Sequence, residues 1–515
     1  WYDESGKVYV GENELQVRDE FDLHDTILIQ DSDVLDTWFS SGLWTFATLG
    51  WPDSSPRLKE FHPTSVLVTG FDIIFFWVAR MIMLSMHLLK DNQNQPEIPF
   101  KTVYVHGLIR DEQGKKMSKS KGNVIDPLDM IDGISLDSLQ EKRISGMMQP
   151  KLAKTIIART AQQFPDGIMP HGADALRFTL CALASTGRDI NWDMKRLEGY
   201  RNFCNKLWNA ARYVLTNTKD QDCGENSVFE LSVADRWIVS ALQRTTALVN
   251  DAFENYRFDL AANALYEFIW NEYCDWYLEL AKPVISAKHT SEKQKTGARK
   301  TLLQVLDAIL RLSHPIIPFI TEEIWRNVKP ATRFKEQSIM LQAYPSVNKN
   351  LLDKNANDDI AWIKTFITCI RTVRAEMNIS PGKMLLAIPV NGNSEDKQRI
   401  EKNRFIICRL ANLEAINWAS HDEELPRGLT TFANELEIVI PITDQININE
   451  ELCRLEVEIA KITEGCKKLK EKLSNKTFRI KAPAHVVEKE EIKLADQLSI
   501  IKKLTKRQQA IKDLT

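Results

Sequence analysis

The alternation of apolar and polar positions divides the chain into regions with different periods. Residues 65–70 (Ser-Val-Leu-Val-Thr-Gly) have the pattern of a short buried strand, and residues 72–89 are apolar on most faces of a helix. A second strand pattern covers 102–109. This order predicts a βαβ unit, whose parallel strands bind ligands at their carboxyl ends. Residues 1–60 before it have loop- and strand-rich patterns, including an alternating run at 7–11.

The later part of the chain has helical periodicity. Leu, Trp and Tyr recur at helical spacing from about 196 to 330, and Pro315 and Pro318 indicate a break. Mixed patterns between 351 and 446 predict a small α/β unit. Its predicted elements are a helix at 359–374 and strands at 385–390 and 436–441.

The last segment has a coiled-coil pattern. Apolar residues recur at alternating steps of three and four, namely at Leu452, Leu455, Ile459, Ile462, Cys466, Leu469 and Leu473. This heptad seam is interrupted between 474 and 485, and a less regular seam follows, which predicts an antiparallel helical hairpin. Residues 461–515 contain 15 Lys and Arg against 7 Asp and Glu, a net charge of +8 in a chain of net charge −3. The excess indicates either a solvated coiled-coil face or a surface that binds nucleic-acid phosphates without regard to sequence.

Composition narrows the class of protein. The chain is 43% hydrophobic and 27% charged, as in ordinary globular proteins of several domains. Its eight cysteines include no Cys-x-x-Cys pair, which argues against a zinc site or a disulfide framework and fits a reducing compartment. The longest apolar stretch, 73–89, contains Arg80 and His87, and we expect it to be too short and too polar to span a membrane.

A short basic loop follows the second predicted strand. Residues 116–120 read Lys-Met-Ser-Lys-Ser, with Gly114 and Gly122 as hinges on either side. Ammonium groups on a flexible loop can close over a triphosphate and balance negative charge in a transition state. Most lysine-rich loops are solvated surface, but this order of residues after a strand resembles the second signature of the class I aminoacyl-tRNA synthetases.

The resemblance extends along the chain to the C-terminal part of the valyl-tRNA synthetase family. It is carried by the loop, the terminal hairpin, and the segments Asp33–Ser41, Gly70–Met81 and Gly187–Asp193. In isoleucyl relatives the second of these segments is polar, whereas here it is apolar at Ile73, Phe75, Phe76 and Trp77.

The resemblance implies a nucleotide site. The residues that match the family's ATP-binding positions are Gly70, Asp72, His106, Gly107, Lys116, Met117, Ser118, Lys119 and Ser120. Lys116 and Lys119 match lysines that contact the phosphates and are the candidate catalytic residues. Asp72 is also suited to cap the following helix, and His106 to a structural role, so these alternatives stay open.

The resemblance also implies an amino-acid pocket. Trp38, Ile73 and Trp77 match residues that wall the side chain of valine, although tryptophans are often buried for packing alone. Rigid aromatic walls favour a small dry pocket. Such a pocket distinguishes a methyl from an isosteric hydroxyl by only about 1–3 kcal/mol, so threonine is expected to enter and to require editing elsewhere.

Two features of the family are absent from this sequence. It has no His-x-Gly-His signature and no editing insertion, and it begins at Trp1 rather than Met. We therefore expect the natural N-terminus and the complementary half of the active site to lie upstream.

The implied whole is a valine–tRNA ligase that uses ATP with Mg²⁺ and acts on valine and tRNA(Val) as a cytoplasmic monomer without a membrane. The expected fold is multidomain α/β plus all-α. Its expected parts are a connecting segment at 1–60, the second half of a Rossmann-type catalytic domain at 61–135, a linker and stem-contact region at 136–195, a helical anticodon-binding domain at 196–350, a small α/β unit at 351–446 and a tRNA-binding coiled coil at 447–515. The alternatives are a catalytically incompetent tRNA-binding fragment and a related isoleucyl- or leucyl-tRNA synthetase.

Overall fold

The computed structural model describes most of the 515 residues. The exceptions are residues 92, 119–120, 146–149, 186, 188, 225–226, 332–335, 420–424, 427, 442–447, 475–483 and 513–515. The chain divides into two compact units. Unit 1 comprises residues 1–172, 179–197 and 252–259, and unit 2 comprises 173–178, 198–251 and 260–515.

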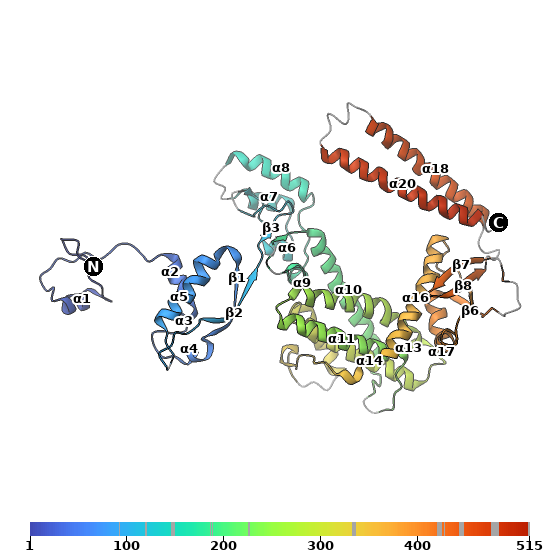
Figure 1. The fold of residues 1–515 in the computed structure, drawn as a ribbon, viewed down its shortest axis with the longest axis horizontal. Coiled ribbons are helices and arrows are strands. Elements are labelled where there is room, and N and C mark those ends of the chain that lie inside the picture. Colours follow the sequence, from blue (N-terminus) through green and yellow to red (C-terminus); the bar gives the residue numbers. More distant parts are fainter. Residues whose placement is uncertain are drawn as a thin grey trace. The chain divides into compact units, whose positions relative to one another are not determined.

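Unit 1 is an α/β assembly (Figure 1). Its helices are α1 (Glu14–Phe21), α2 (Thr37–Gly42), α3 (Trp44–Ala47), α4 (Pro56–Phe61), α5 (Ala79–Leu88), α6 (Pro127–Asp132), α7 (Leu136–Ile144) and α8 (Ala153–Gln163). Its strands are β1 (Thr64–Gly70), β2 (Phe100–His106), β3 (Ile109–Arg110) and β4 (Ile190–Asn191). The run predicted to alternate at 7–11 forms only an isolated bridge, between Tyr2 and Val8.

The predicted βαβ unit is confirmed. β1 and β2 pair in parallel from Thr64 opposite Phe100 to Gly70 opposite His106, so both strands end at the same edge. The connection between them packs on the sheet through a cluster that contains Leu67, Val78, Met81 and Phe100. A strand predicted at 102–109 is divided, because the chain leaves β2 at His106 and β3 pairs instead with β4.

The helix predicted at 72–89 is more irregular than expected. A 3₁₀ turn, η1 (Phe71–Ile73), is followed by a π-helical turn, η2 (Ile74–Val78), and then by α5. Hydrophobic pattern alone does not separate these forms, because Ile74–Val78 is apolar at every position. π-Helical turns are rare and frequently lie at functional sites, so this irregularity itself points to the segment.

The expectation that this segment is too short and too polar to span a membrane is wrong on length and composition. Within the described residues, Phe71–Leu88 is long and apolar enough to cross a membrane by length and composition alone. A single segment of this kind is weak evidence for a membrane span, since the core helices of soluble proteins can be equally long and apolar. Here it connects two strands that pair along their length, and Val78 and Met81 pack on the sheet. We interpret it as a crossover helix.

Unit 2 begins with a helical region. Its helices are α9 (Ala173–Leu183), α10 (Met194–Thr218), α11 (Val233–Glu254), α12 (Phe258–Tyr266), the π-helical η5 (Glu267–Tyr277), α13 (Leu278–Ser286), α14 (Glu292–Ser313) and α15 (Pro318–Val328), of which α9 to α12 each have some residues in unit 1. The predicted break lies between α14 and α15, where Pro318 is the first residue of the new helix. Trp325 and Tyr273 are fully buried in this region.

A small α/β unit follows, as predicted. It consists of α16 (Lys354–Glu376), α17 (Ser394–Ala411), β5 (Leu385–Val390), β6 (Leu413–Ile416), β7 (Gly428–Ala433) and β8 (Leu436–Pro441). The strand order is β6-β5-β8-β7, with only the β5–β6 pair parallel.

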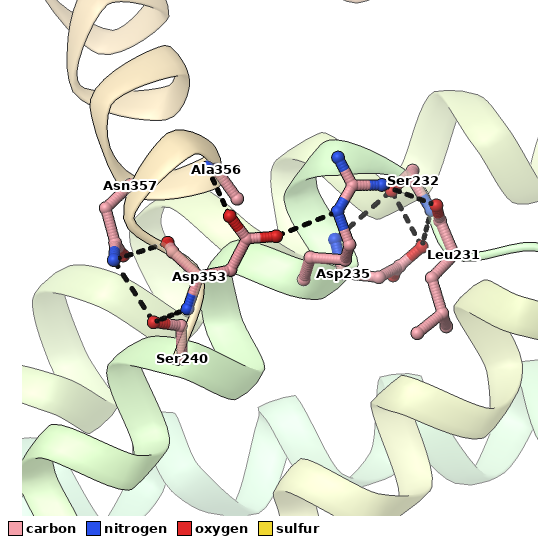
Figure 2. Close-up of polar contacts among 8 residues, drawn as sticks. Leu231, Ser232, Asp235, Ser240, Asp353, Ala356 and Asn357 are labelled. Carbon is pink, nitrogen blue, oxygen red and sulfur yellow. Dashed lines mark hydrogen bonds and ion pairs between the residues drawn. The ribbon is translucent and has the colours of Figure 1, made fainter. Parts of the chain in front are cut away.

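The start of α16 is fixed to α11 by a compact polar network (Figure 2). Asp353 caps α16 by accepting from the Ala356 N–H at 2.9 Å. The buried Ser240 hydroxyl accepts from the Asp353 N–H at 3.0 Å and from Asn357 Nδ2 at 3.1 Å. Arg236 Nε donates to Asp353 Oδ2 at 3.1 Å. Because buried polar groups need partners, this network sets the position at which α16 leaves the helical region.

The chain ends in the predicted helical hairpin, α18 (Ile448–Ser474) and α20 (Ala484–Lys512) (Figure 1). Cross-helix contacts show the antiparallel register, since Lys472 pairs with Glu490, Cys466 with Gln497 and Glu456 with Gln508. Cys466 and Leu473 of the predicted seam are buried. Most of the predicted interruption between 474 and 485 lies outside the described residues, including its proline, Pro483.

Candidate functional site

Three predicted nucleotide-site residues converge at the ends of β1 and β2. Gly70 is paired with His106 in the sheet, and Asp72 follows in the 3₁₀ turn. A Cβ atom at position 70 would lie 2.7 Å from Asp72 Oδ1 and 3.6 Å from His106 Cε1. Only glycine therefore fits at this position without displacing the Asp72 carboxylate.

His106 contacts the backbone in this arrangement. Its Nδ1 lies 2.9 Å from the Gly107 carbonyl oxygen, which only accepts, so this contact is a hydrogen bond in the tautomer with Nδ1 protonated. Gly107 is buried and His106 half-buried, whereas the Asp72 carboxylate is exposed. A sugar hydroxyl of a nucleotide could donate to this carboxylate, which matches an ATP-binding position of the family.

The candidate amino-acid pocket lies on α2 and the π-helical turn. Trp77 Nε1 donates to the Ser41 carbonyl at 3.1 Å, which joins η2 to α2. The Trp38 ring lies on Phe76, with centroids 5.8 Å apart. Trp77 also packs against the core cluster under the sheet, so the packing alternative holds for part of this side chain. Trp38, Ile73 and Trp77 are all half-buried, and sequence reasoning missed Ser41 and Phe76 as the groups that fix them.

The basic loop leaves the short β3 strand. Lys116 and Ser118 belong to the described residues, whereas Lys119 and Ser120 lie outside them, so the structure places only part of the predicted phosphate site. The Lys116 side chain is exposed and Met117 is half-buried. Lys116 forms an isolated backbone bridge with Arg110, which holds the start of the motif beside β3.

Asp189 anchors β3. Its carboxylate accepts from the Leu108 N–H at 3.0 Å and forms an ion pair with Arg110, and both contacts lower the pKa of Asp189 below its usual value. This residue belongs to the segment 187–193 that carries the family resemblance, and the structure gives it a role in positioning the strand from which the loop departs.

A cavity of about 540 Å³ flanks the far end of the loop. It is lined by Gly122, Val124, Ile125, Asp126, Pro127, Asp129, Leu139, Lys142, Arg143 and Ser145, none of which was a predicted site residue. Lys142 Nζ lies 2.8 Å from both Asp126 Oδ2 and Asp129 Oδ1. These paired charges raise the pKa of Lys142 and lower that of Asp126. Within the described residues, no group of three or more His, Cys, Asp or Glu side chains could hold a metal ion.

The helical region exposes few of its aromatic side chains. Phe268 and Tyr273 are buried, whereas Trp208 is 40% exposed. Trp270 stacks on Tyr266 with ring centroids 5.6 Å apart, and the Lys206 ammonium lies 3.7 Å from the centroid of its ring. An aromatic surface beside a cation suits contact with unpaired nucleotide bases.

The hairpin presents lysines away from its seam. Lys461, Lys467 and Lys468 on α18 are exposed, as is Lys502 on α20. The contact of Lys468 with Glu464, at 3.6 Å, is between two exposed side chains and adds little stability. The excess positive charge is therefore available to a polyanion.

Three family models match successive parts of the chain. The model described as "tRNA synthetases class I (I, L, M and V)" matches residues 4–193, "Anticodon-binding domain of tRNA ligase" matches 235–388, and "Valyl tRNA synthetase tRNA binding arm" matches 447–512.

Solved structures of similar chains are more distant. A LeuRS in a ternary complex with tRNA from Agrobacterium radiobacter K84 is 16% identical with a TM-score of 0.43, over 80% of this chain and 42% of that one. Two methionyl-tRNA synthetase structures from Mycobacterium tuberculosis, both with methionyl-adenylate, are 21% and 19% identical, with TM-scores of 0.38 and 0.39. The first match covers 54% of this chain and 46% of that structure's chain, and the second covers 57% of this chain and 54% of that structure's chain. The chain thus spans about half the length of the solved structures it matches.

Proposed function

Since the chain belongs to the class I aminoacyl-tRNA synthetases, we propose that it supplies one half of the active site and the tRNA-binding parts of a valine–tRNA ligase. The observation that favours valine over the related amino acids is the match of residues 447–512 to the valyl-type tRNA-binding arm. The apolar character of η2, where isoleucyl relatives are polar, agrees with this choice.

ATP fits the edge where β1 and β2 end. Gly70 leaves room for the Asp72 side chain beside it, and the exposed Asp72 carboxylate accepts from the ribose. Lys116 and Lys119 neutralise the phosphates as pyrophosphate leaves, with Met117, Ser118 and Ser120 shaping the loop. Catalysis of this kind depends on positioning and on charge stabilisation rather than on a protein nucleophile. Mg²⁺ enters with the phosphates of ATP, and we assign it no protein ligand in this chain.

The reaction joins valine to tRNA(Val) in two steps. The valine carboxylate attacks the α-phosphate, pyrophosphate leaves and valyl-adenylate forms. A hydroxyl of the terminal ribose then attacks the acyl carbon, the aminoacyl group passes to the tRNA, and AMP leaves. Trp38, Ile73 and Trp77 line one side of the valine side chain. The helical region contacts the anticodon, and the hairpin of α18 and α20 contacts the tRNA backbone.

The test is ATP–pyrophosphate exchange with valine, isoleucine, leucine and methionine. The 515-residue chain is assayed alone and with a polypeptide that carries the His-x-Gly-His half. We expect exchange only in the reconstituted enzyme and highest with valine. Lys116→Ala should slow exchange about 100-fold or more, as expected for loss of a group that stabilises transition-state charge. Lys115→Ala, an exposed neighbour, is the matched control.

Each alternative has its own outcome in this assay. Binding of tRNA without exchange in the reconstituted enzyme would support a catalytically incompetent tRNA-binding fragment. A preference for isoleucine or leucine would assign the chain to that relative instead.

A further inference from the structure

The two ends of the basic loop are buried although the loop is strongly cationic. Asp111 and Asn123 are only 6% and 7% exposed, whereas Lys115, Lys116 and Lys121 between them are exposed. Buried polar side chains are retained where hydrogen bonds satisfy them. Their partners therefore indicate what these two residues do.

Asp111 closes the first half of the loop. Its Oδ1 accepts from the Gln113 N–H at 3.0 Å and from the Lys115 N–H at 2.8 Å. Its Oδ2 accepts from Asn123 Nδ2 at 2.9 Å. Burial acts to raise the pKa of Asp111, but these hydrogen bonds outweigh it and hold the pKa below its usual value. The carboxylate is thus charged and fully engaged.

Asn123 holds the signature itself. Its Oδ1 accepts from the Ser118 N–H at 2.9 Å, and its Nδ2 donates to the Lys116 carbonyl at 3.3 Å as well as to Asp111. Contacts on both sides of Met117 need an acceptor and a donor in one short side chain. Asparagine has both, whereas a charged aspartate has no donor.

The base of the loop rests on α8. Arg159 Nη2 lies 3.6 Å from Asp111 Oδ2. Gly122 has a φ of +60°, and a Cβ atom there would lie 2.6 Å from Ile156 Cδ1. The loop thus leaves and returns on a packed surface, while its lysine side chains remain exposed.

We propose that Asp111 and Asn123 are positioning residues that form a clasp, which sets where Lys116 stands when the loop meets the nucleotide. The clasp acts through the backbone of the loop and does not touch the substrate. Its effect on catalysis rests on the function proposed above, whereas its effect on the order of the loop does not.

The first test measures loop opening in the 515-residue chain. In the wild-type protein, the amide protons of Gln113, Lys115 and Ser118 should exchange more slowly than that of Glu112. Asn123→Ala and Asp111→Asn each remove or weaken these contacts. They should speed trypsin cleavage after Lys115 and Lys116 about ten- to a hundredfold, as expected for loss of charge-assisted hydrogen bonds in a local opening.

The reciprocal variant D111N/N123D separates a clasp from general packing. The amide introduced at position 111 could accept from the loop N–H groups and donate to the carboxylate introduced at position 123. That carboxylate could also accept from the Ser118 N–H but could not donate to the Lys116 carbonyl, so cleavage should return only part of the way to the wild-type rate. Glu112→Gln removes an adjacent charge without touching these contacts and should leave cleavage unchanged. Thermal unfolding of each variant checks that the chain is folded.

Several results would overturn the proposal. Wild-type cleavage rates in both single variants, or amide protons that exchange as in an open chain, would show that the contacts do not hold the loop. A reciprocal variant as sensitive as the single ones would show that the hydrogen bond between positions 111 and 123 does not hold the loop.

Activity in the complete enzyme tests the catalytic part. Asn123→Ala should lower kcat for pyrophosphate exchange while KM for valine changes less than twofold. Unchanged kcat together with faster cleavage would overturn the positioning role in catalysis, although the two residues would still hold the loop. Absence of exchange in the wild-type enzyme would instead contradict the proposed function.

Discussion

The hairpin makes a quantitative prediction about salt. Lys461, Lys467 and Lys468 are exposed on α18, and the first and last lie about 10 Å apart along the helix because seven residues rise about 1.5 Å each. Phosphates of an RNA backbone could contact all three. Each such contact contributes about 0.7–0.9 to the slope of log K against log[salt]. Replacing all three by Gln should therefore flatten the slope by about 2–3.

The difference is large enough to measure by fluorescence anisotropy with labelled tRNA(Val). Between 50 and 200 mM KCl, salt should weaken binding by the triple variant about 16- to 64-fold less than binding by the wild-type chain, because the fourfold change in salt enters to the power of the missing slope. The matched control replaces Lys354 and Lys402, which are exposed in the small α/β unit, and Lys349, which is exposed just before it, and changes net charge equally. Parallel slopes for wild type and the hairpin variant, or equal flattening by the control, would refute local phosphate binding by the hairpin.

Three further predictions concern stability. Gly122→Ala should lower the free energy of thermal unfolding by about 1–3 kcal/mol, because position 122 has a positive φ and the new Cβ would contact Ile156, whereas Gly199→Ala, in open space on α10, should leave stability unchanged or raise it. Equal changes in the melting temperature of the two variants would contradict this reasoning. Ser240→Ala should cost about 1–3 kcal/mol in urea unfolding, because two donors at the start of α16 lose their acceptor, and an unchanged midpoint would show that water replaces it. Because its pKa is lowered in the folded protein, Asp189 stabilises the fold at pH values above the pKa of an unfolded aspartate, about 4, and this stabilisation should be lost as the pH falls through the pKa of the folded state. If Asp189→Asn loses stability in acid in the same way as the wild type, this carboxylate is not the cause.

Elements with a clear period were the most predictable. The strands expected at 385–390 and 436–441 match the bounds of β5 and β8, where alternate residues are buried or two faces are apolar. The heptad seam predicted the terminal hairpin for the same reason. In both cases the pattern of apolar residues repeats over enough positions to distinguish a strand from a helix.

Tertiary contacts were not predictable in this way. The clasp of Asp111 and Asn123 joins residues twelve apart in a loop, and no periodicity connects them. Likewise, Asp189 and Arg110 meet only because β3 and β4 pair. Sequence reasoning identified the motif between these contacts through its chemistry, but the residues that hold it become visible only once the chain is folded.

The exposure of η2 bears on how an amino-acid pocket could work here. Discrimination among aliphatic side chains needs a dry pocket, because the transfer of a methylene from water supplies only about 0.8 kcal/mol. Yet Phe75 is 80% exposed, Phe76 48% and Phe71 47%, and all three adjoin Ile73 and Trp77. These rings supply one apolar wall that faces solvent within the described part of the chain. Under the proposed function, valine becomes enclosed only when a second wall covers this face. Selectivity should therefore arise with assembly of the catalytic domain, whereas the tRNA-binding charge is already present on the hairpin.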